Sequence, residues 1–236
     1  SSHLLDSAVL VFTRDPATGA LGFVEVQTNT HIGQGLAGAQ SIAVSPDGAH
    51  VYVAASLEES EVAIFQRDRF TGKLSYLYNE DNDEFRTAVA IAMAPDGARL
   101  YYLSRNYDGD QVLVVLDRVT DSGNGGFGTV AFRQVVQQGV NGVDGLEGAT
   151  SVVVGPNGRH VYVAGSRDIF STQNFVTDFH RDSATGEIDF LEVKKDGVDG
   201  VVGLSGAAAV AVSPDSSAVY VAANRSDAVV AFRVAA

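Results

Sequence analysis

The sequence predicts an all-β fold, a β-propeller of four-stranded antiparallel blades, with about four blades' worth of repeats. One phrase occurs four times: a run of small and apolar residues, a turn of the Pro-Asp-Gly type and a strand of the Val-Tyr-Val type. The prolines of the turns, at positions 46, 95, 156 and 214, are separated by 49, 61 and 58 residues. Glycine is abundant, at 25 of 236 residues, as a fold with many tight turns requires.

The first two strands of each repeat flank this turn. The first strand is rich in small residues, as in Ile42–Val44, and side chains as small as Ala43 let backbones converge near an axis. In the turn, Pro fixes φ, Asp caps the backbone and Gly accepts a positive φ. The second strand carries a tyrosine at the same position in every repeat. These four residues are therefore predicted to pack one sheet against the next: Tyr52, Tyr101, Tyr162 and Tyr220.

The third and fourth strands complete the repeat. The third strand is apolar and ends on an Arg-Asp pair, which we interpret as an ion pair that stabilises the turn. It is expected at Ala8–Asp15, Val62–Asp68 and Val176–Asp182, while Asp117-Arg118 reverses the pair. A Thr-Gly turn leads to the fourth strand, whose alternating pattern is typical of a half-buried outer strand. It is expected at Leu21–Val26, Leu74–Leu77 and Ile188–Leu191.

Residues 1–236 are predicted to form a single domain. The chain begins with a third and a fourth strand, continues through three full repeats, and finishes with a first, a second and a third strand at Ala228–Arg233. Three alternatives remain open: a ring closed within one chain, a ring completed by strand exchange in a homo-oligomer, or a fragment of a longer or engineered protein. Bare sheet edges invite pairing with another chain. Ser1–His3 lacks the pattern of a signal peptide, and a cloning remnant is one interpretation of it.

Composition disfavours several partners. Acidic residues outnumber basic ones by 29 to 16, so the net charge of −13 opposes binding to nucleic acid or to an anionic membrane surface. No stretch approaches 18 apolar residues, the length that spans a bilayer. The chain has no cysteine, which removes disulfides, thiol catalysis and thiolate metal sites. We expect a soluble protein, in a compartment that is either exported or periplasmic or else cytoplasmic.

Three phrases carry a resemblance to a known family. They are Ser-Pro-Asp-Gly-x-x-Val-Tyr-Val-Ala (Ser45–Ala54), Val-x-x-Phe-x-Arg-Asp-x-x-Thr-Gly (Val9–Gly19 and Val62–Gly72) and Gly-Leu-x-Gly-Ala (Gly145–Ala149 and Gly203–Ala207). The chain resembles the lactonase-type seven-bladed β-propellers, which include bacterial 6-phosphogluconolactonases and YVTN-repeat surface proteins. The resemblance implies the propeller fold and, as an expectation, lactone hydrolysis. Because seven blades form the site in that family, no catalytic residue is carried over.

The loops that join the second strand to the third, and the fourth to the first, are expected on one face around the channel. They differ from repeat to repeat, and Arg and Asn side chains in them can hold a carboxylate or phosphate through forked hydrogen bonds. A small anionic ligand is therefore one predicted partner. Alternatively, the arginines pair with aspartates of the same loops. The predicted ligand-binding residues are Arg105, Asn106, Arg167, Asp168, Asn224, Arg225 and His31.

Acidic, glycine-rich loops on the same face suggest a weaker candidate, a calcium site. Ca²⁺ takes six to eight oxygen ligands, and its candidate ligands here are Asp144, Glu147, Asp196 and Asp199. The spacing of an EF-hand is missing, so solvated loops without a cofactor are the leading expectation. His50 and His160 share one position in different repeats, and we interpret them as structural rather than metal-binding.

No catalytic signature occurs in the sequence: there is no Gly-x-Ser-x-Gly, no His-Glu-x-x-His and no phosphate-cradling glycine loop. The leading hypothesis is a non-catalytic binding or scaffold module that uses the channel-face loops for a ligand, a partner or self-association. The first alternative is a lactonase-like hydrolase, with a general base such as His31 and an arginine that stabilises the oxyanion. The second alternative is a propeller fragment without activity of its own.

Overall fold

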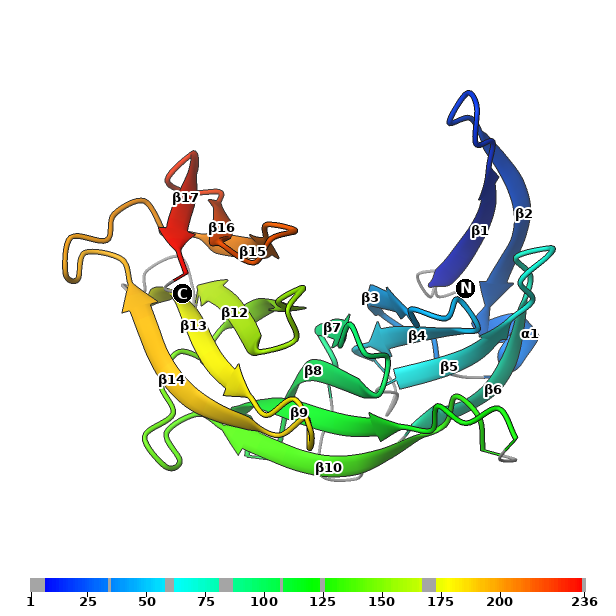
Figure 1. Cartoon of the computed structure of the whole chain (residues 1–236), viewed down its shortest axis with the longest axis horizontal. Coiled ribbons are helices and arrows are strands. Elements are labelled where there is room, and N and C mark those ends of the chain that lie inside the picture. The colour runs from blue at the N-terminus through cyan, green and yellow to red at the C-terminus, as the bar shows by residue number, and fades with distance from the viewer. Residues whose placement is uncertain are drawn as a thin grey trace, which may run out of the picture.

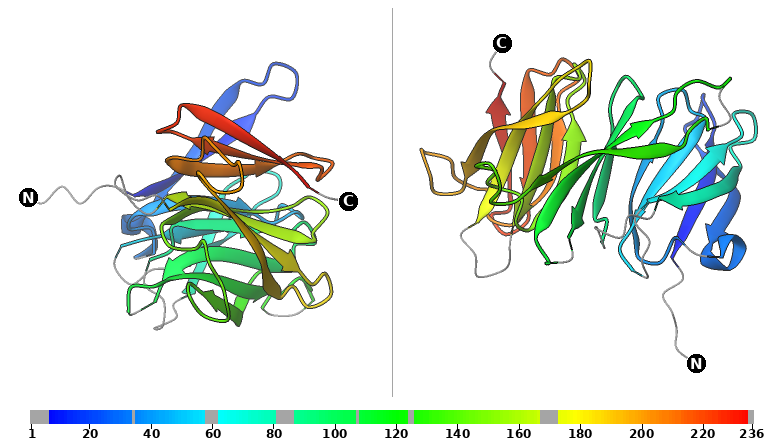
Figure 2. Two further views of the ribbon diagram at one scale, coloured as in Figure 1. Left: turned by 90° about the vertical axis from the view of Figure 1, so that its left-hand side faces the viewer. Right: turned by 90° about the horizontal axis from the view of Figure 1, so that it is seen from below.

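The computed structural model describes residues 7–33, 35–57, 62–80, 87–106, 108–123, 126–166 and 173–234. In these ranges the chain forms antiparallel sheets that follow one another along an open arc (Figure 1). The sheets stand side by side, with the N-terminal hairpin and the C-terminal sheet at opposite ends (Figure 2). The predicted all-β fold of propeller-type sheets is confirmed.

The sheets take up their strands in chain order. The first sheet is a hairpin of β1 (Ala8–Arg14) and β2 (Leu21–Thr28). The second sheet comprises β3 (Ala39–Val44), β4 (His50–Ala55), β5 (Val62–Arg67) and β6 (Leu74–Glu80). The third comprises β7 (Ala90–Met93), β8 (Arg99–Arg105), β9 (Gln111–Arg118) and β10 (Val130–Gln137). The fourth comprises β11 (Ala149–Val154), β12 (His160–Ser166), β13 (Asn174–Arg181) and β14 (Ile188–Lys195). The fifth comprises β15 (Ala207–Val212), β16 (Ala218–Ala223) and β17 (Ala228–Arg233).

The described strands thus form one two-stranded sheet, three four-stranded sheets and one three-stranded sheet. The described residues do not close a ring, because β1–β2 and β15–β17 belong to separate sheets. One helix was not predicted: α1 (Asn29–Ile32) lies in the loop between β2 and β3. With four residues, this one helix of the described ranges is too short to cross a bilayer.

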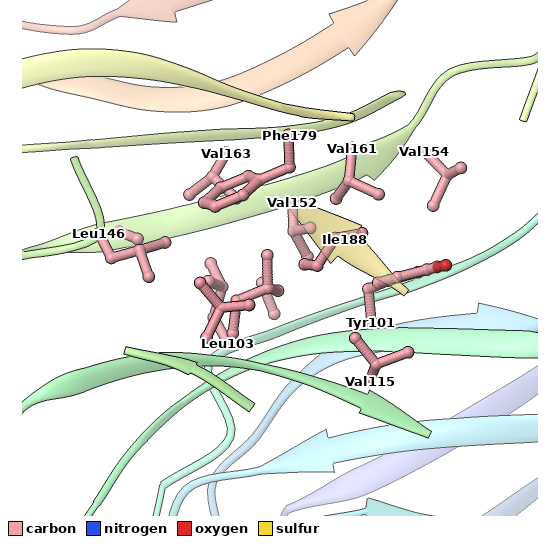
Figure 3. Packing of buried hydrophobic residues seen from close by; sticks show 14 of the residues in the cluster. Tyr101, Leu103, Val115, Leu146, Val152, Val154, Val161, Val163, Phe179 and Ile188 are labelled. Atoms are coloured by element: carbon pink, nitrogen blue, oxygen red, sulfur yellow. The ribbon is translucent and has the colours of Figure 1, made fainter. Parts of the chain in front are cut away.

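The hydrophobic core lies between the sheets. In the cluster of Figure 3, Tyr101 and Leu103 of β8 face Val161 and Val163 of β12, and Phe179 of β13 packs among them. Equivalent clusters fill the other three junctions between neighbouring sheets. Each sheet is therefore stabilised by burying its faces against its neighbours, which is how a radial repeat gains its stability.

A buried arginine fastens the second sheet to the third. The Arg118 guanidinium donates from Nε to Tyr52 Oη (2.7 Å), from Nη1 to Gly97 O (3.0 Å) and from Nη2 to Asp47 Oδ2 (2.8 Å). Tyr52 Oη in turn donates to Gly128 O (2.8 Å). Although burial opposes it, hydrogen bonds from Ser45, Ala49 and Arg118 hold the pKa of Asp47 well below its usual range.

The junction between the third and fourth sheets repeats this arrangement atom for atom. Arg181 donates from Nε to Tyr101 Oη (2.6 Å), from Nη1 to Gly158 O (2.8 Å) and from Nη2 to Asp96 Oδ2 (2.5 Å). The partner of the arginine is thus the aspartate of the preceding repeat's turn. Asp182, the neighbour of Arg181 in sequence, instead accepts N–H groups of its own Thr-Gly turn. We call this set of contacts the arginine clamp.

The junction between the fourth and fifth sheets lacks the two charged members of the clamp. The position of the turn aspartate holds Asn157. The position of the arginine holds Val234, whose backbone N–H donates to Ser217 O as that of Arg118 does to Ala98 O. Both partners are thus replaced together, and no charge is left unpaired by the change.

Candidate functional site

The loops between the fourth strand of one sheet and the first strand of the next are held by a repeated hydrogen bond. In three of these loops, a polar side chain accepts the backbone N–H of a leucine with no exposed surface. The pairs are Asn29 with Leu36 (2.7 Å), Gln138 with Leu146 (2.8 Å) and Asp196 with Leu204 (3.0 Å). Asp196, a predicted calcium ligand, therefore has the same structural role as the neutral Asn29 and Gln138.

Polar side chains at the start of the third strands hold the same loops through further hydrogen bonds. Gln111 Oε1 accepts the N–H of Gly148 (3.1 Å), and Asn174 Oδ1 accepts the N–H of Gly206 (2.9 Å). Gln111 and Asn174 are buried. These buried amides therefore hold in place the loops that join one sheet to the next. We call the side of the molecule that carries these loops, and the loops between the second and third strands, the loop face.

The predicted calcium ligands lie in two different loops. Asp144 forms an ion pair with Lys195 (2.6 Å), and the hydrogen bond from Lys195 lowers the pKa of Asp144. Asp199 has a φ of 50° in a tight turn, and the N–H of Glu147 donates to Gln138 Oε1 (3.3 Å). Within the described ranges, no three His, Asp or Glu residues are grouped closely enough to hold a metal ion.

The predicted ligand-binding residues are distributed along the loop face. Asn106 Oδ1 accepts the N–H of Asp110 (2.8 Å) and so shapes the turn between β8 and β9. The N–H of Asn224 donates to Gly206 O (3.0 Å), which ties the start of the loop between β16 and β17 to the residue before β15. Arg167 and Asp168 lie outside the described residues.

Three cationic or titratable side chains of that set are exposed. Arg105 is exposed at the end of β8. Arg225 donates to Ser166 Oγ across the junction between the fourth and fifth sheets (3.3 Å). His31 lies on α1, with Nδ1 at 3.3 Å from Thr28 Oγ1. The contacts of Arg225 and His31 differ from the loop-holding hydrogen bonds, which recur from one sheet to the next.

A groove lies between β12–β14 and the edge of β17. This groove has a volume of about 370 Å³. Its polar lining consists of His160, Tyr162, Asp178, Glu192, Lys194 and Arg233. His160 Nδ1 lies 2.9 Å from Asp178 Oδ1, and burial raises the pKa of Asp178.

Sequence reasoning missed Asp178, although a signal was present. Asp178 pairs with Tyr162, as Ile64 pairs with Tyr52 and Val115 with Tyr101. Ile64 and Val115 are fully buried. A carboxylate at a position that is aliphatic in the other sheets is a departure from the repeat, and comparing the repeats column by column would have identified it.

Comparison with known proteins gives one family. Residues 3–124 match the model of the lactonase family, described as a seven-bladed β-propeller. No curated protein matches the chain.

Several solved structures share the fold. A Bacteroides uniformis protein assigned as a 6-phosphogluconolactonase has 18% identity and a TM-score of 0.69, over 96% of this chain and 60% of its own. The Pseudomonas aeruginosa periplasmic gluconolactonase has 18% identity and a TM-score of 0.51, over 96% of this chain and 73% of its own. Chaetomium thermophilum Sqt1 has 19% identity and a TM-score of 0.58, over 97% of this chain and 54% of its own. At these identities the likeness establishes the fold, and this chain spans 60% of the length of the Bacteroides uniformis protein.

Proposed function

Because the chain belongs to the lactonase family of seven-bladed β-propellers, we propose that it forms part of a lactonase-like hydrolase. The family match over residues 3–124 is the observation that carries this proposal. The names of two structural neighbours, a 6-phosphogluconolactonase and a gluconolactonase, support sugar lactones as the substrate class.

Opening a lactone requires a base and a group that stabilises negative charge. A base takes a proton from water, the oxygen of this water attacks the ester carbonyl, and the ring C–O bond then breaks to give a hydroxy acid. Hydrogen-bond donors or cations near the carbonyl oxygen stabilise the tetrahedral intermediate. On the loop face, His31 has the chemistry of the base, and Arg225 and Arg105 have the chemistry of the cation.

The location on the loop face rests on a contrast within the molecule. The recurring polar side chains there hold loops, as Gln138 and Asp196 do. His31, Arg105 and Arg225 take no part in these loop-holding hydrogen bonds, and all three are exposed. In a chain of net charge −13, arginines at the loop face favour a substrate that carries a carboxylate or phosphate.

The test is lactone hydrolysis followed by pH-stat, with neutral and phosphorylated sugar lactones. The variants are His31→Gln and Arg225→Gln, with His160→Gln as the matched control because its imidazole lies in the groove. We expect His31→Gln to lower kcat/KM by at least about 10²-fold, the usual contribution of a general base, and His160→Gln to leave it unchanged.

Two results would contradict this proposal. Loss of activity in His160→Gln alone would exclude the loop face as the catalytic site and assign the chemistry to the groove. Binding of a lactone without turnover above buffer would instead favour the non-catalytic binding module.

A further inference from the structure

A fully buried histidine lies at the junction between the second and third sheets. His50, the first residue of β4, has no exposed surface. Its ring packs edge-on against the ring of Phe127, with centroids 4.6 Å apart. The edge of the ring that carries Nε2 meets Gly128, where a Cβ would overlap the imidazole. Phe127 and Gly128 belong to the turn before β10, so His50 is enclosed between its own sheet and the next one.

The hydrogen-bond partner of His50 fixes its protonation. Arg118 Nη2 lies 3.0 Å from His50 Nδ1. A guanidinium carries hydrogen-bond donors and no acceptor, so Nδ1 is the acceptor, and the ring is neutral with its proton on Nε2. The same guanidinium donates from Nε to the hydroxyl of Tyr52, two residues further along β4 (2.7 Å). In the closed junction His50 is thus an uncharged member of the arginine clamp.

The charged groups around His50 disfavour a second proton on the ring. Burial, and then the charge of Arg118, lower the pKa of the His50 imidazole, and Arg69 in the turn between β5 and β6 acts in the same direction. Asp47 and the backbone of Phe127 act in the opposite direction without reversing the shift. The Asp47 carboxylate already accepts a hydrogen bond from Arg118 at Oδ2 (2.8 Å). A positive charge on His50 would therefore lie in a buried site beside an arginine.

The third sheet carries a permanent cation at the position of His50. Arg99 is the first residue of β8, and its Nε donates to Thr185 O (2.9 Å). Asp117 stands opposite Arg99 on β9, and its Oδ1 lies 2.8 Å from Arg99 Nε. The residue opposite His50 on β5 is the neutral Gln66. The third sheet thus supplies a counter-charge at this position, and the second sheet does not.

One backbone hydrogen bond crosses each junction between neighbouring sheets that have their fourth strands. The N–H of the first residue of a fourth strand donates to a side chain on the fourth strand of the preceding sheet. The pairs are Leu74 with Glu25 Oε1 (2.6 Å), Val130 with Tyr78 Oη (2.7 Å) and Ile188 with Gln134 Oε1 (2.8 Å). The bond of Val130 crosses the junction that contains His50, and the bond of Ile188 crosses the junction that contains Arg99. Exchange of these two amide hydrogens therefore reports on the two junctions separately.

We propose that His50 makes the junction between the second and third sheets acid-sensitive, while the junction between the third and fourth sheets is not. When His50 takes up a proton, Nδ1 loses the lone pair that accepts from Arg118, and two cations then face each other in a buried site. Opening of the junction exposes both cations to water and separates them. Mildly acidic solution therefore favours the open junction, because the open form binds one proton that the closed form excludes.

The direction and size of the effect follow from proton linkage. Because burial lowers the pKa of His50 in the closed form, its contribution to stability is present above about pH 6.5, the ordinary value for histidine, and is lost as the pH falls below it. Uptake of one proton changes an equilibrium by at most about tenfold for each pH unit. Between pH 7.5 and pH 5.5, the opening equilibrium of this junction should therefore increase by up to about tenfold.

The first test is hydrogen–deuterium exchange of the full chain, resolved to single amides, at pH 7.5 and pH 5.5. After correction for the chemical exchange rate at each pH, the opening that exposes the Val130 amide should be up to about tenfold more frequent at pH 5.5. The Ile188 amide should change by less than about twofold, since Arg99 keeps its charge throughout. No acid-dependent change at Val130, or an equal change at both amides, would overturn the proposal.

The second test removes the titrating group. His50→Asn keeps an oxygen acceptor near the position of Nδ1 but takes up no proton, so the Val130 amide of this variant should show no acid-dependent change. The matched control is His160→Asn, because His160 has the same position in the fourth sheet and its Nδ1 faces Asp178 rather than an arginine (2.9 Å). This control should respond to acid as the wild type does. Persistence of the response in His50→Asn, or its loss in His160→Asn, would contradict the assignment to His50.

A third variant leaves the buried ring in place. Gln66→Asp supplies a carboxylate opposite His50, as Asp117 does opposite Arg99, and Gln66 is exposed, so the substitution does not disturb the core. The carboxylate should stabilise the protonated imidazole in the closed junction and reduce the acid response at Val130 by at least about half. An unchanged response would contradict the comparison with the third sheet on which the proposal rests.

Discussion

Replacing Arg118 by methionine tests the arginine clamp directly. Methionine keeps the apolar stem of the side chain and removes the guanidinium, together with its hydrogen bonds to Tyr52, Gly97 and Asp47. The Arg118 side chain is 2% exposed, whereas that of Asp47 is 32% exposed. Breaking a fully buried ion pair costs about 3–5 kcal/mol. Because water reaches Asp47, we expect a loss of about 2–4 kcal/mol in the free energy of unfolding.

Urea unfolding at pH 7, followed by circular dichroism, measures this loss. For a chain of this length each kcal/mol corresponds to about 2–4 °C in Tm, so thermal unfolding should shift by about 4–16 °C. The control is Arg133→Met, because Arg133 is 27% exposed and pairs with Asp117 and Glu187 at the surface. Surface pairs contribute about 0–1 kcal/mol. Equal losses in the two variants would refute the reasoning that burial makes the clamp strong.

Two further predictions concern the last junction. Asn157→Asp combined with Val234→Arg should rebuild the clamp there, so the double variant should exceed the sum of the single variants by about 1 kcal/mol in a urea double-mutant cycle; simple additivity would contradict this. Burial raises the pKa of the Asp178 carboxyl in the folded state. The free energy of unfolding therefore falls as the pH rises above about 3.9, the pKa of this carboxyl in the unfolded chain. Asp178→Asn removes this loss, so the Tm of the variant minus that of the wild type should increase between pH 4 and pH 7. If this difference in Tm stays constant across that range, burial of Asp178 is not the cause.

Repetition made the fold predictable from the sequence. A tyrosine occurs at the same position of the second strand in all four repeats. A residue that recurs at a fixed position after a Pro-Asp-Gly turn is most simply explained by packing between neighbouring sheets. In the structure, Tyr52 and Tyr101 are buried between sheets and hydrogen-bonded at their hydroxyl groups. The strand order followed from the same repeats, because each turn type marks one connection.

Contacts between repeats were less accessible to this reasoning. Arg181 stands beside Asp182 in the sequence, yet its guanidinium reaches Asp96, 85 residues away. Sequence adjacency suggested the wrong neighbour, since a strand's successive side chains point to opposite faces. The groove was also missed, because it depends on which strand lies over which sheet. The loop-face residues remain predictions, and two of them, Arg167 and Asp168, lie outside the described residues.

Glu25, Tyr78 and Gln134 have equivalent positions on the fourth strands of three successive sheets. Each accepts a hydrogen bond from the backbone N–H of the first residue of the next sheet's fourth strand. One side chain is charged, one is aromatic and one is an amide, so the only feature they share is an oxygen acceptor at this position. Such a position requires an oxygen acceptor at a given distance from the backbone, and several residue types provide one. The sequences of propeller repeats can therefore diverge at this position while neighbouring sheets keep the same hydrogen bond.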